Sequence, residues 1–302
     1  MTTPTLEQQR PPRAYPPVAL LGTGPMGAPI ARNILNHGVP LTLWNRTPEK
    51  ALAIEGAVVA ASPADAARDI VLTVLPDLPQ VEALLHGDDG LLKGWQTAGT
   101  EHPILVIHGT VSPVAVAEFA DRCQRSWGVT LVDAPLSGGT IGAEEGRLSI
   151  MAGGPKAAVE RLAPLFELYG STAVWFGDTG AGSTVKACNQ IVVAATVTAL
   201  AEAMALAAGS NLDLEKVQAV LAGGLANSEV LAQKGRRWID QDFEGGGSAK
   251  NQLKDLRFIA EIAGHNGLEL PLAACLQNAF EDMVAAGDGD LDHTGIYRTI
   301  ST

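Results

Sequence analysis

Short apolar runs recur along the first 180 or so residues, and turn-forming residues bound each of them. Between most of these runs lie stretches with the spacing of an amphipathic helix, for example residues 28–36 and 114–125. Continuous apolar runs that alternate with helices are typical of a parallel sheet covered by helices on both faces. We therefore predict strands at Val18–Leu21, Leu41–Trp44, Ile70–Leu75, Ile104–Ile107, Thr130–Val132, Leu148–Met151 and Ala173–Phe176.

This alternation stops near Gly182, and only helical patterns come after it. Residues 183–208 form one long Ala-rich pattern in which the run Ile191–Ala201 is apolar nearly all round. Such a helix should be buried on every side, and in a domain of about 120 residues this suggests that a second subunit covers part of it. Further helices are predicted at 211–222, 228–239, 249–263 and 272–286.

Charge and cysteine content narrow the possible function classes. The chain has 21 Lys and Arg residues against 33 Asp and Glu residues, a net charge of −12, which argues against nucleic-acid and anionic-membrane partners. Cys123, Cys188 and Cys275 lie far apart without metal-ligand spacing, so we expect neither a disulfide framework nor a metal site. No secretory leader is apparent, and Glu202 interrupts the longest apolar run before it could span a bilayer. These features predict a soluble, cytoplasmic protein.

The first predicted strand runs directly into a G-x-G-x-x-G motif, and a helical pattern opens behind it. In this context Gly22 permits a tight turn, Gly24 lets the backbone approach a pyrophosphate, and Gly27 lets helix and strand pack closely. A purely structural turn is the alternative, and the flanking strand and helix weigh against it. We therefore assign dinucleotide binding to the segment Gly22, Gly24, Pro25, Met26 and Gly27.

With this motif in place, we predict an α/β fold: a Rossmann-type, doubly wound parallel sheet followed by an all-α C-terminal domain. The sheet domain is expected to span residues 17–181 and the helical domain residues 182–302. Residues 1–16 are polar and rich in proline, which predicts a disordered arm.

The residues that follow the second predicted strand indicate which dinucleotide the protein prefers. An acidic residue near this point would bind the adenosine ribose, but the sequence here is Asn45-Arg46-Thr47. A guanidinium beside a hydroxyl suits a 2′-phosphate, so we predict NADP(H) rather than NAD(H). A solvated surface arginine is the alternative interpretation.

Two later segments carry candidate substrate chemistry. Ser137-Gly138-Gly139 offers a hydroxyl and unhindered backbone N–H groups that could hold a carboxylate, although taken alone it is also an ordinary glycine turn. On the long helix, Lys186, Asn189 and Gln190 share one face. Burying the charge of a lysine in the first turns of an apolar helix costs folding free energy. Such a lysine is therefore expected to be paired, to be functional or to extend to the surface.

Four blocks together closely resemble the β-hydroxyacid dehydrogenase family, which includes 3-hydroxyisobutyrate dehydrogenase and tartronate semialdehyde reductase. They are Gly22–Gly27, Asp133–Gly139, Gly182–Gln190 and Lys254-Asp255-Leu256, in this order and at the family's separations. The resemblance covers roughly residues 17–300, and the Asn189-Gln190 pair is most similar to the tartronate semialdehyde reductases.

The resemblance implies a role for each matching residue. Lys186 would be the catalytic acid/base. Ser137, Gly138, Gly139 and Asn189 would hold a small carboxylate-bearing substrate, with Gln190 beside them. The cofactor would be contacted by Leu75, Pro76, Thr110 and Lys254, and the helical domain would form a homodimer or homotetramer.

Some positions depart from the family pattern or leave the specificity open. Gly109-Thr110, preceded by His108, stands where family members commonly carry Ser-Thr or Ser-Ser, which leaves open a modified contact near the nicotinamide. Trp238 and Phe243 are either specificity residues or simple core.

We expect hydride transfer between NADP(H) and a small 3-hydroxy acid or its semialdehyde. The substrate would be of the tartronate semialdehyde, 3-hydroxyisobutyrate, succinic semialdehyde or glyoxylate class. The alternatives are an imine reductase on the same scaffold, against which Lys186 counts, and a non-catalytic dinucleotide-binding protein.

Overall fold

The computed structural model describes residues 15–301, which form two compact units. Unit 1 runs up to Gly109 and resumes at Glu118–Thr179, and unit 2 combines Thr110–Ala117 with the chain from Gly180 onward. Most of the predicted N-terminal arm, residues 1–14, lies outside the described residues. Tyr15, the first described residue, is half-buried and packs against the core of unit 1.

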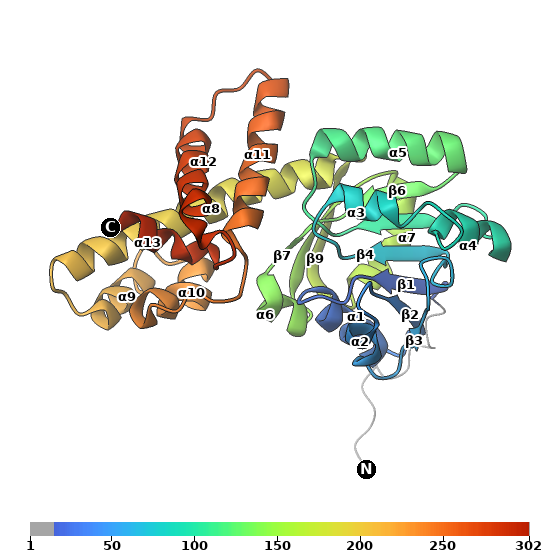
Figure 1. Ribbon diagram of the computed structural model, residues 1–302, viewed down its shortest axis with the longest axis horizontal. Helices are drawn as coiled ribbons and strands as arrows, with labels where there is room; N and C mark the ends of the chain where they lie inside the picture. Colours follow the sequence, from blue (N-terminus) through green and yellow to red (C-terminus); the bar gives the residue numbers. More distant parts are fainter. Residues whose placement is uncertain (1–14, 302) are drawn as a thin grey trace, which may run out of the picture. The chain divides into compact units, whose positions relative to one another are not determined.

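Unit 1 is built on one sheet with strand order β3-β2-β1-β4-β5-β6-β8-β7, and β9 pairs with β8 (Figure 1). The strands are β1 (Val18–Leu21), β2 (Leu41–Trp44), β3 (Val58–Val59), β4 (Ile70–Thr73), β5 (Ile104–Ile107), β6 (Thr130–Asp133), β7 (Leu136–Ser137), β8 (Leu148–Gly153) and β9 (Gly170–Gly177). The helices are α1 (Gly27–Asn36), α2 (Pro48–Leu52), α3 (Leu78–Ala83), α4 (Leu91–Ala98), α5 (Pro113–Trp127), α6 (Gly139–Glu144) and α7 (Lys156–Phe166); of α5, the residues up to Ala117 are counted with unit 2.

Strands β3, β2, β1, β4, β5 and β6 are parallel throughout. Apart from the edge strand β3, where Val58 is exposed, their apolar residues are almost all buried because helices cover the sheet. The register aligns Leu21 with Trp44 and Thr73, and Thr73 with Ile107. The loops after these residues therefore start from one edge of the sheet, which is where ligands bind in doubly wound folds.

The predicted fold class is confirmed, with one local difference: β8 runs antiparallel to β6 and β7. Strand direction depends on how the connecting chain returns to the sheet, and an apolar run in the sequence does not encode it.

Unit 2 is helical and surrounds the long helix α8 (Ala181–Gly209). Helix α8 packs against each of the other α-helices of the unit, and α11 and α12 form a neighbouring pair in Figure 1. These helices are α9 (Leu214–Ala222), α10 (Glu229–Asp240), α11 (Ala249–His265), α12 (Pro271–Met283) and α13 (Ile296–Ile300), with the short turns η2 (Val284–Asp288) and η3 (His293–Gly295).

The expectation that helix α8 is buried on every side included coverage by a second subunit, and in the single chain one side of the helix is exposed. Ala194, Val197 and Ala201 face the core of unit 2, whereas Val192 and Leu206 are 65% and 74% exposed. By length and composition alone α8 could cross a membrane, a property that core helices of soluble proteins share. The helix agrees closely with the pattern predicted over residues 183–208. The expectation that Glu202 makes the apolar run too short to span a bilayer is wrong by this measure, because the helix continues past Glu202 to Gly209.

Candidate functional site

The glycine-rich loop after β1 packs tightly at two of its glycines and is open at the third. Gly22 has φ +102°, its N–H donates to the Trp44 carbonyl (2.9 Å), and a Cβ on it would lie 2.5 Å from the Val74 carbonyl oxygen. A Cβ on Gly27 would lie 1.9 Å from the Gly22 carbonyl oxygen. Both glycines are therefore required by the fold of the loop itself.

Gly24 differs, because a Cβ there would meet nothing within 4 Å. Its neighbour Pro25 is exposed, and Met26, at the start of α1, is half-buried against the core. An open glycine beside the N-terminus of a ten-residue helix fits the pyrophosphate of a dinucleotide, which needs close backbone approach and N–H donors.

The loop after β2 is held to the glycine-rich loop by Asn45. Its Oδ1 accepts from the Thr23 N–H (2.9 Å), and its Nδ2 donates to the Thr47 carbonyl (2.9 Å). Asn45 is thus a structural bridge between the two loops. Arg46 and Thr47 are exposed, and within residues 15–301 the Arg46 guanidinium forms no hydrogen bond or ion pair.

The loops after β4 and β5 touch at the same edge of the sheet. A Cβ on Gly109 would lie 2.1 Å from the Leu75 carbonyl oxygen, so only glycine allows this approach. Leu75 also lies against Gly22, while Pro76 is exposed. Unit 1 therefore brings the glycine-rich loop, Asn45, Leu75 and Gly109 together.

His108 does not line this edge. The ring is buried, with Nδ1 2.6 Å from the Ala134 carbonyl and Nε2 3.0 Å from the Tyr169 hydroxyl, and it packs edge-on against Phe166 and Tyr169. Burial lowers the pKa of His108 to about 4, so the ring is neutral, donates from Nδ1 to Ala134 and accepts from Tyr169. Both ring nitrogens are therefore used inside unit 1, and the modified contact near the nicotinamide stays a prediction for Gly109 and Thr110.

The predicted carboxylate cradle lies in unit 1, after β6. Ser137 ends β7 opposite Ser149 and is partly exposed. Gly138 (φ +127°) and Gly139 (φ +65°) adopt backbone angles that favour glycine, which accounts for the pair.

The remaining predicted residues lie in unit 2, where Lys186 is the central group. It projects from the first turns of α8 and is only 8% exposed. Burial lowers the pKa of Lys186 to about 8; the charge of Asp255 opposes this shift and the charge of Lys254 adds to it. An amine with a pKa near neutrality can both donate and accept a proton, as an acid/base catalyst must.

Asp255, which the sequence analysis named only within the Lys254-Asp255-Leu256 block and gave no role, contacts two of the predicted residues. Gln190 Nε2 donates to Asp255 Oδ2 (2.7 Å), and Asn189 Nδ2 donates to Gln190 Oε1 (2.9 Å). Lys254 Nζ lies 3.8 Å from Asp255 Oδ1 and donates to the Thr110 carbonyl (2.9 Å). The available signal was the position of Asp255 among apolar residues on the buried face of α11, where a carboxylate needs partners.

Trp238 and Phe243 belong to the core of unit 2. Trp238 is fully buried and donates from Nε1 to the Thr294 carbonyl (3.1 Å), and Phe243 stacks on Tyr297. This supports the core interpretation of both residues.

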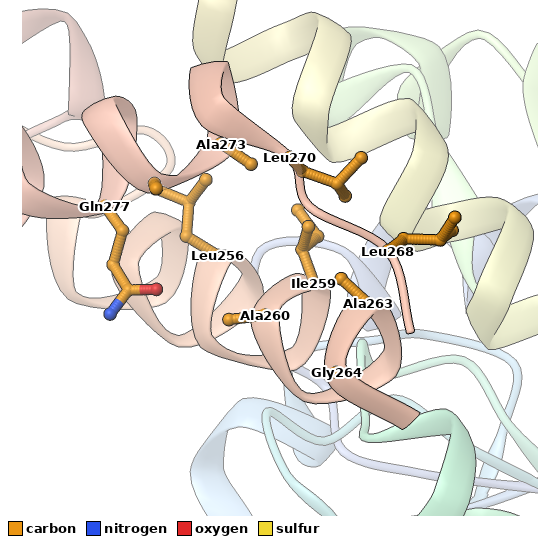
Figure 2. A pocket seen from close by; sticks show the side chains of 10 residues that line it. Leu256, Ile259, Ala260, Ala263, Gly264, Leu268, Leu270, Ala273 and Gln277 are labelled. Atoms are coloured by element: carbon orange, nitrogen blue, oxygen red, sulfur yellow. The ribbon is translucent and has the colours of Figure 1, made fainter. Parts of the chain in front are cut away.

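A separate cavity of about 220 Å³ lies between α11 and α12 (Figure 2). Its lining is apolar apart from Gln277, so it offers no acid, base or metal ligand. Among residues 15–301 no group of three or more His, Cys, Asp or Glu side chains could hold a metal ion. The cavity is lined by Leu256, Ile259, Ala260, Ala263, Gly264, Leu268, Leu270, Ala273, Ala274 and Gln277.

Two family models match the chain. Residues 17–177 match the NAD-binding domain of 6-phosphogluconate dehydrogenase, and residues 180–300 match the corresponding NAD-binding model of NADP-dependent 3-hydroxyisobutyrate dehydrogenase. The 2-hydroxy-3-oxopropionate reductase of Escherichia coli is 35% identical over 286 residues, covering 94% of this chain and 96% of that protein.

Solved structures agree with these matches. A 3-hydroxyisobutyrate dehydrogenase from Salmonella typhimurium superposes with a TM-score of 0.85 at 29% identity, covering 93% of this chain and 99% of that one. An imine reductase from Myxococcus stipitatus in complex with NADP+ has a TM-score of 0.63 at 20% identity, with 94% and 99% covered, which shows a shared fold alone.

Proposed function

We propose that this chain, which belongs to the β-hydroxyacid dehydrogenase family, reduces a small carboxylate-bearing semialdehyde to its 3-hydroxy acid with NADPH, and catalyses the reverse reaction. The coarser activity, an NAD(P)-dependent oxidoreductase of 3-hydroxy acids and semialdehydes, is supported by its relatives. The observation that carries the proposal is the buried Lys186, whose lowered pKa suits proton transfer.

A nicotinamide cofactor held by the glycine-rich loop would supply the hydride for reduction or accept it in oxidation. The Lys186 ammonium protonates the oxygen that becomes the hydroxyl during reduction, and the neutral amine takes that proton back during oxidation. Asn189 orients this oxygen from the same helix, one turn beyond Lys186. Ser137 and the N–H groups of Gly138 and Gly139 hold the substrate carboxylate, which favours acids over neutral carbonyl compounds.

NADP(H) is the proposed cofactor because of the chemistry of the loop after β2. Within residues 45–47 there is no carboxylate to bind a ribose hydroxyl, whereas the exposed Arg46 and Thr47 can reach a 2′-phosphate.

Tartronate semialdehyde is the preferred substrate candidate, because the 35%-identical relative carries the name 2-hydroxy-3-oxopropionate reductase. The test is initial-rate kinetics with NADPH on tartronate semialdehyde, succinic semialdehyde, glyoxylate and a cyclic imine. We expect turnover of the acids and none of the imine. Turnover of the imine alone would contradict the proposal and favour an imine reductase.

The role of Lys186 is tested by Lys186→Ala. Loss of the proton donor should lower kcat by about 100-fold or more, the range of general acid–base catalysis, while NADPH affinity stays within about threefold. Fluorescence titration of NADPH measures the affinity separately from turnover. A variant that retains near-normal kcat would remove Lys186 from the mechanism.

A further inference from the structure

Two neighbouring side chains inside unit 2 carry polar atoms without a hydrogen-bond partner. Gln252, on the buried face of α11, is 2% exposed, and His293, in η3, is 8% exposed. His293 Nδ1 lies 3.0 Å from Gln252 Oε1, so a hydrogen bond joins the two groups. Within residues 15–301 neither Gln252 Nε2 nor His293 Nε2 has a partner. Leaving buried polar groups unpartnered costs folding free energy, which indicates that this pair receives a group that the chain does not supply.

The His293 ring is held in place through the residue before it. Asp292 is fully buried, and its carboxylate accepts from the N–H and the hydroxyl of Thr294 (3.0 and 2.7 Å). The same carboxylate accepts from the Gly247 N–H (2.9 Å) and from the Lys234 ammonium (2.5 Å). His293 Nε2 lies 3.9 Å from Asp292 Oδ1, which is too far for a hydrogen bond. The ring is therefore fixed in position while its Nε2 stays available to a ligand.

The pair offers one donor and one acceptor, whichever way its ring and amide are oriented. Burial lowers the pKa of His293 to about 4, so the ring is neutral and carries a single N–H. An N–H at Nδ1 donates to the Gln252 oxygen, which leaves Nε2 as an acceptor and the amide NH2 as a donor. An N–H at Nε2 goes with the reversed amide, which leaves that N–H as a donor and the amide oxygen as an acceptor. A hydroxyl group, which both donates and accepts, completes the pair in either case, and a methyl group in neither.

The pair lies beside the face of α8 that carries Lys186. Gln252 precedes Asp255 by three residues, so both side chains leave the same face of α11. Asp255 Oδ2 accepts from Gln190 (2.7 Å), which shares a face of α8 with Lys186. The turn η3 packs against both α8 and α11, and the charge of Lys186 is among those that lower the pKa of His293. The unpartnered atoms therefore belong to the surroundings of the proposed acid/base.

We propose that Gln252 and His293 bind a hydroxyl on C2 of the substrate, and so select a 2,3-dihydroxy acid and its 2-hydroxy semialdehyde. This inference rests on the proposed function, in which Lys186 exchanges a proton with the oxygen on C3. Because C2 is bonded to both C3 and the carboxylate carbon, its substituent lies next to that oxygen. A hydroxyl there gives both atoms a partner, whereas a methyl group leaves both unsatisfied and shields them from water.

Two acids isolate the group on C2. Glycerate carries a hydroxyl where 3-hydroxyisobutyrate carries a methyl group of similar size, and the carboxylate and the C3 hydroxyl are the same. Initial rates with NADP+ and each enantiomer of both acids give kcat/KM. We expect the wild type to prefer glycerate by about 100-fold or more, because a site that hydrogen-bonds a hydroxyl rejects an analogue without it. A wild type that oxidises both acids equally well, or prefers 3-hydroxyisobutyrate, would overturn the inference, and this comparison needs no variant to fold.

The double variant Gln252→Met, His293→Phe tests whether this pair makes the selection. It replaces both polar groups with apolar groups of similar shape, so no buried polar atom of the pair is left unpartnered. The preference for glycerate should fall at least about tenfold, because an apolar pocket distinguishes a hydroxyl from a methyl group only weakly. The matched control Gln124→Met, His265→Phe makes the same substitutions at two exposed positions and should keep the wild-type preference.

The ratio of the two kcat/KM values separates substrate selection from other roles of the pair. If the pair holds only a buried water, the double variant shifts the midpoint of thermal unfolding but keeps the wild-type ratio, which would overturn the inference. A purely structural role would lower both kcat/KM values by the same factor and would overturn it as well. If the wild type oxidises neither acid and reduces no acid of the substrate panel, the proposed function itself fails, and this inference fails with it.

Discussion

At the scale of single residues, Arg46 decides the predicted cofactor preference. Its guanidinium is exposed at the end of β2, beside a loop that Asn45 fixes against the glycine-rich turn. Removing a charge-assisted contact to a 2′-phosphate costs about 1.5–3 kcal/mol, which corresponds to roughly 10- to 100-fold in affinity. Arg46→Ala should therefore raise the Kd for NADPH by this factor and leave that for NADH within about threefold.

The measurement is fluorescence titration of both cofactors with both proteins. Arg68→Ala is the control, because it removes another arginine of unit 1 whose guanidinium bonds backbone carbonyls of its own loop. Equal weakening of NADPH and NADH binding by Arg46→Ala would contradict the assignment of the 2′-phosphate to this side chain.

Some of the candidate site residues could be grouped from the sequence and others could not. Lys186, Asn189 and Gln190 could be grouped from helical spacing alone, because residues three and four apart share a face. Asp255 could not be added to them, since it is 65 residues from Gln190 in the chain. The direction of the His108 side chain was likewise beyond local spacing, because its ring contacts the Tyr169 hydroxyl, 61 residues away in the chain.

At the scale of elements, most strands and helices could be predicted from the apolar residues. Residues on one face recur at every second position in a strand and at every third or fourth position in a helix, so the two patterns differ. The strands β3 and β7 were missed because two residues show no periodicity. The antiparallel pairing of β8 could not be predicted from the apolar runs either, because strand direction depends on the path of the connecting chain.

The glycine-rich turn yields a prediction that separates packing from ligand binding. Gly24→Val places its side chain in open space, so the midpoint of thermal unfolding should change by no more than about 2 °C. The same side chain would occupy the position of the pyrophosphate, and the Kd for NADPH should rise at least about tenfold. Gly27→Val is the counterpart: it collides with the Gly22 carbonyl and should lower the unfolding midpoint. Tight NADPH binding by Gly24→Val would show that this loop does not hold the cofactor.

At the scale of the whole molecule, the exposed side of α8 is the basis for a proposal about assembly. Before its last residue, Gly209, the exposed residues of α8 fall at steps of three, four and seven and so line one stripe of the helix. We call this the α8 stripe: Cys188, Val192, Ala199, Glu202 and Leu206. This spacing is that of a seam between packed helices. We propose that a second copy of the chain covers the α8 stripe; Glu202 within the stripe argues for a protein partner over the interior of a membrane.

The prediction is that the protein is a dimer or tetramer at micromolar concentration and that the double variant Val192→Asp, Leu206→Asp is a monomer. Val192 and Leu206 are 65% and 74% exposed in the single chain, so aspartate at both positions leaves the fold of unit 2 intact and opposes only the association. Light scattering coupled to size exclusion gives the mass, and circular dichroism checks the fold.

As a control, Val58→Asp changes an exposed valine of unit 1 and should leave the mass unchanged. A monomeric wild type would contradict the proposal. A variant that keeps the wild-type mass would place the interface elsewhere, because two carboxylates facing their copies in an apolar seam are strongly unfavourable.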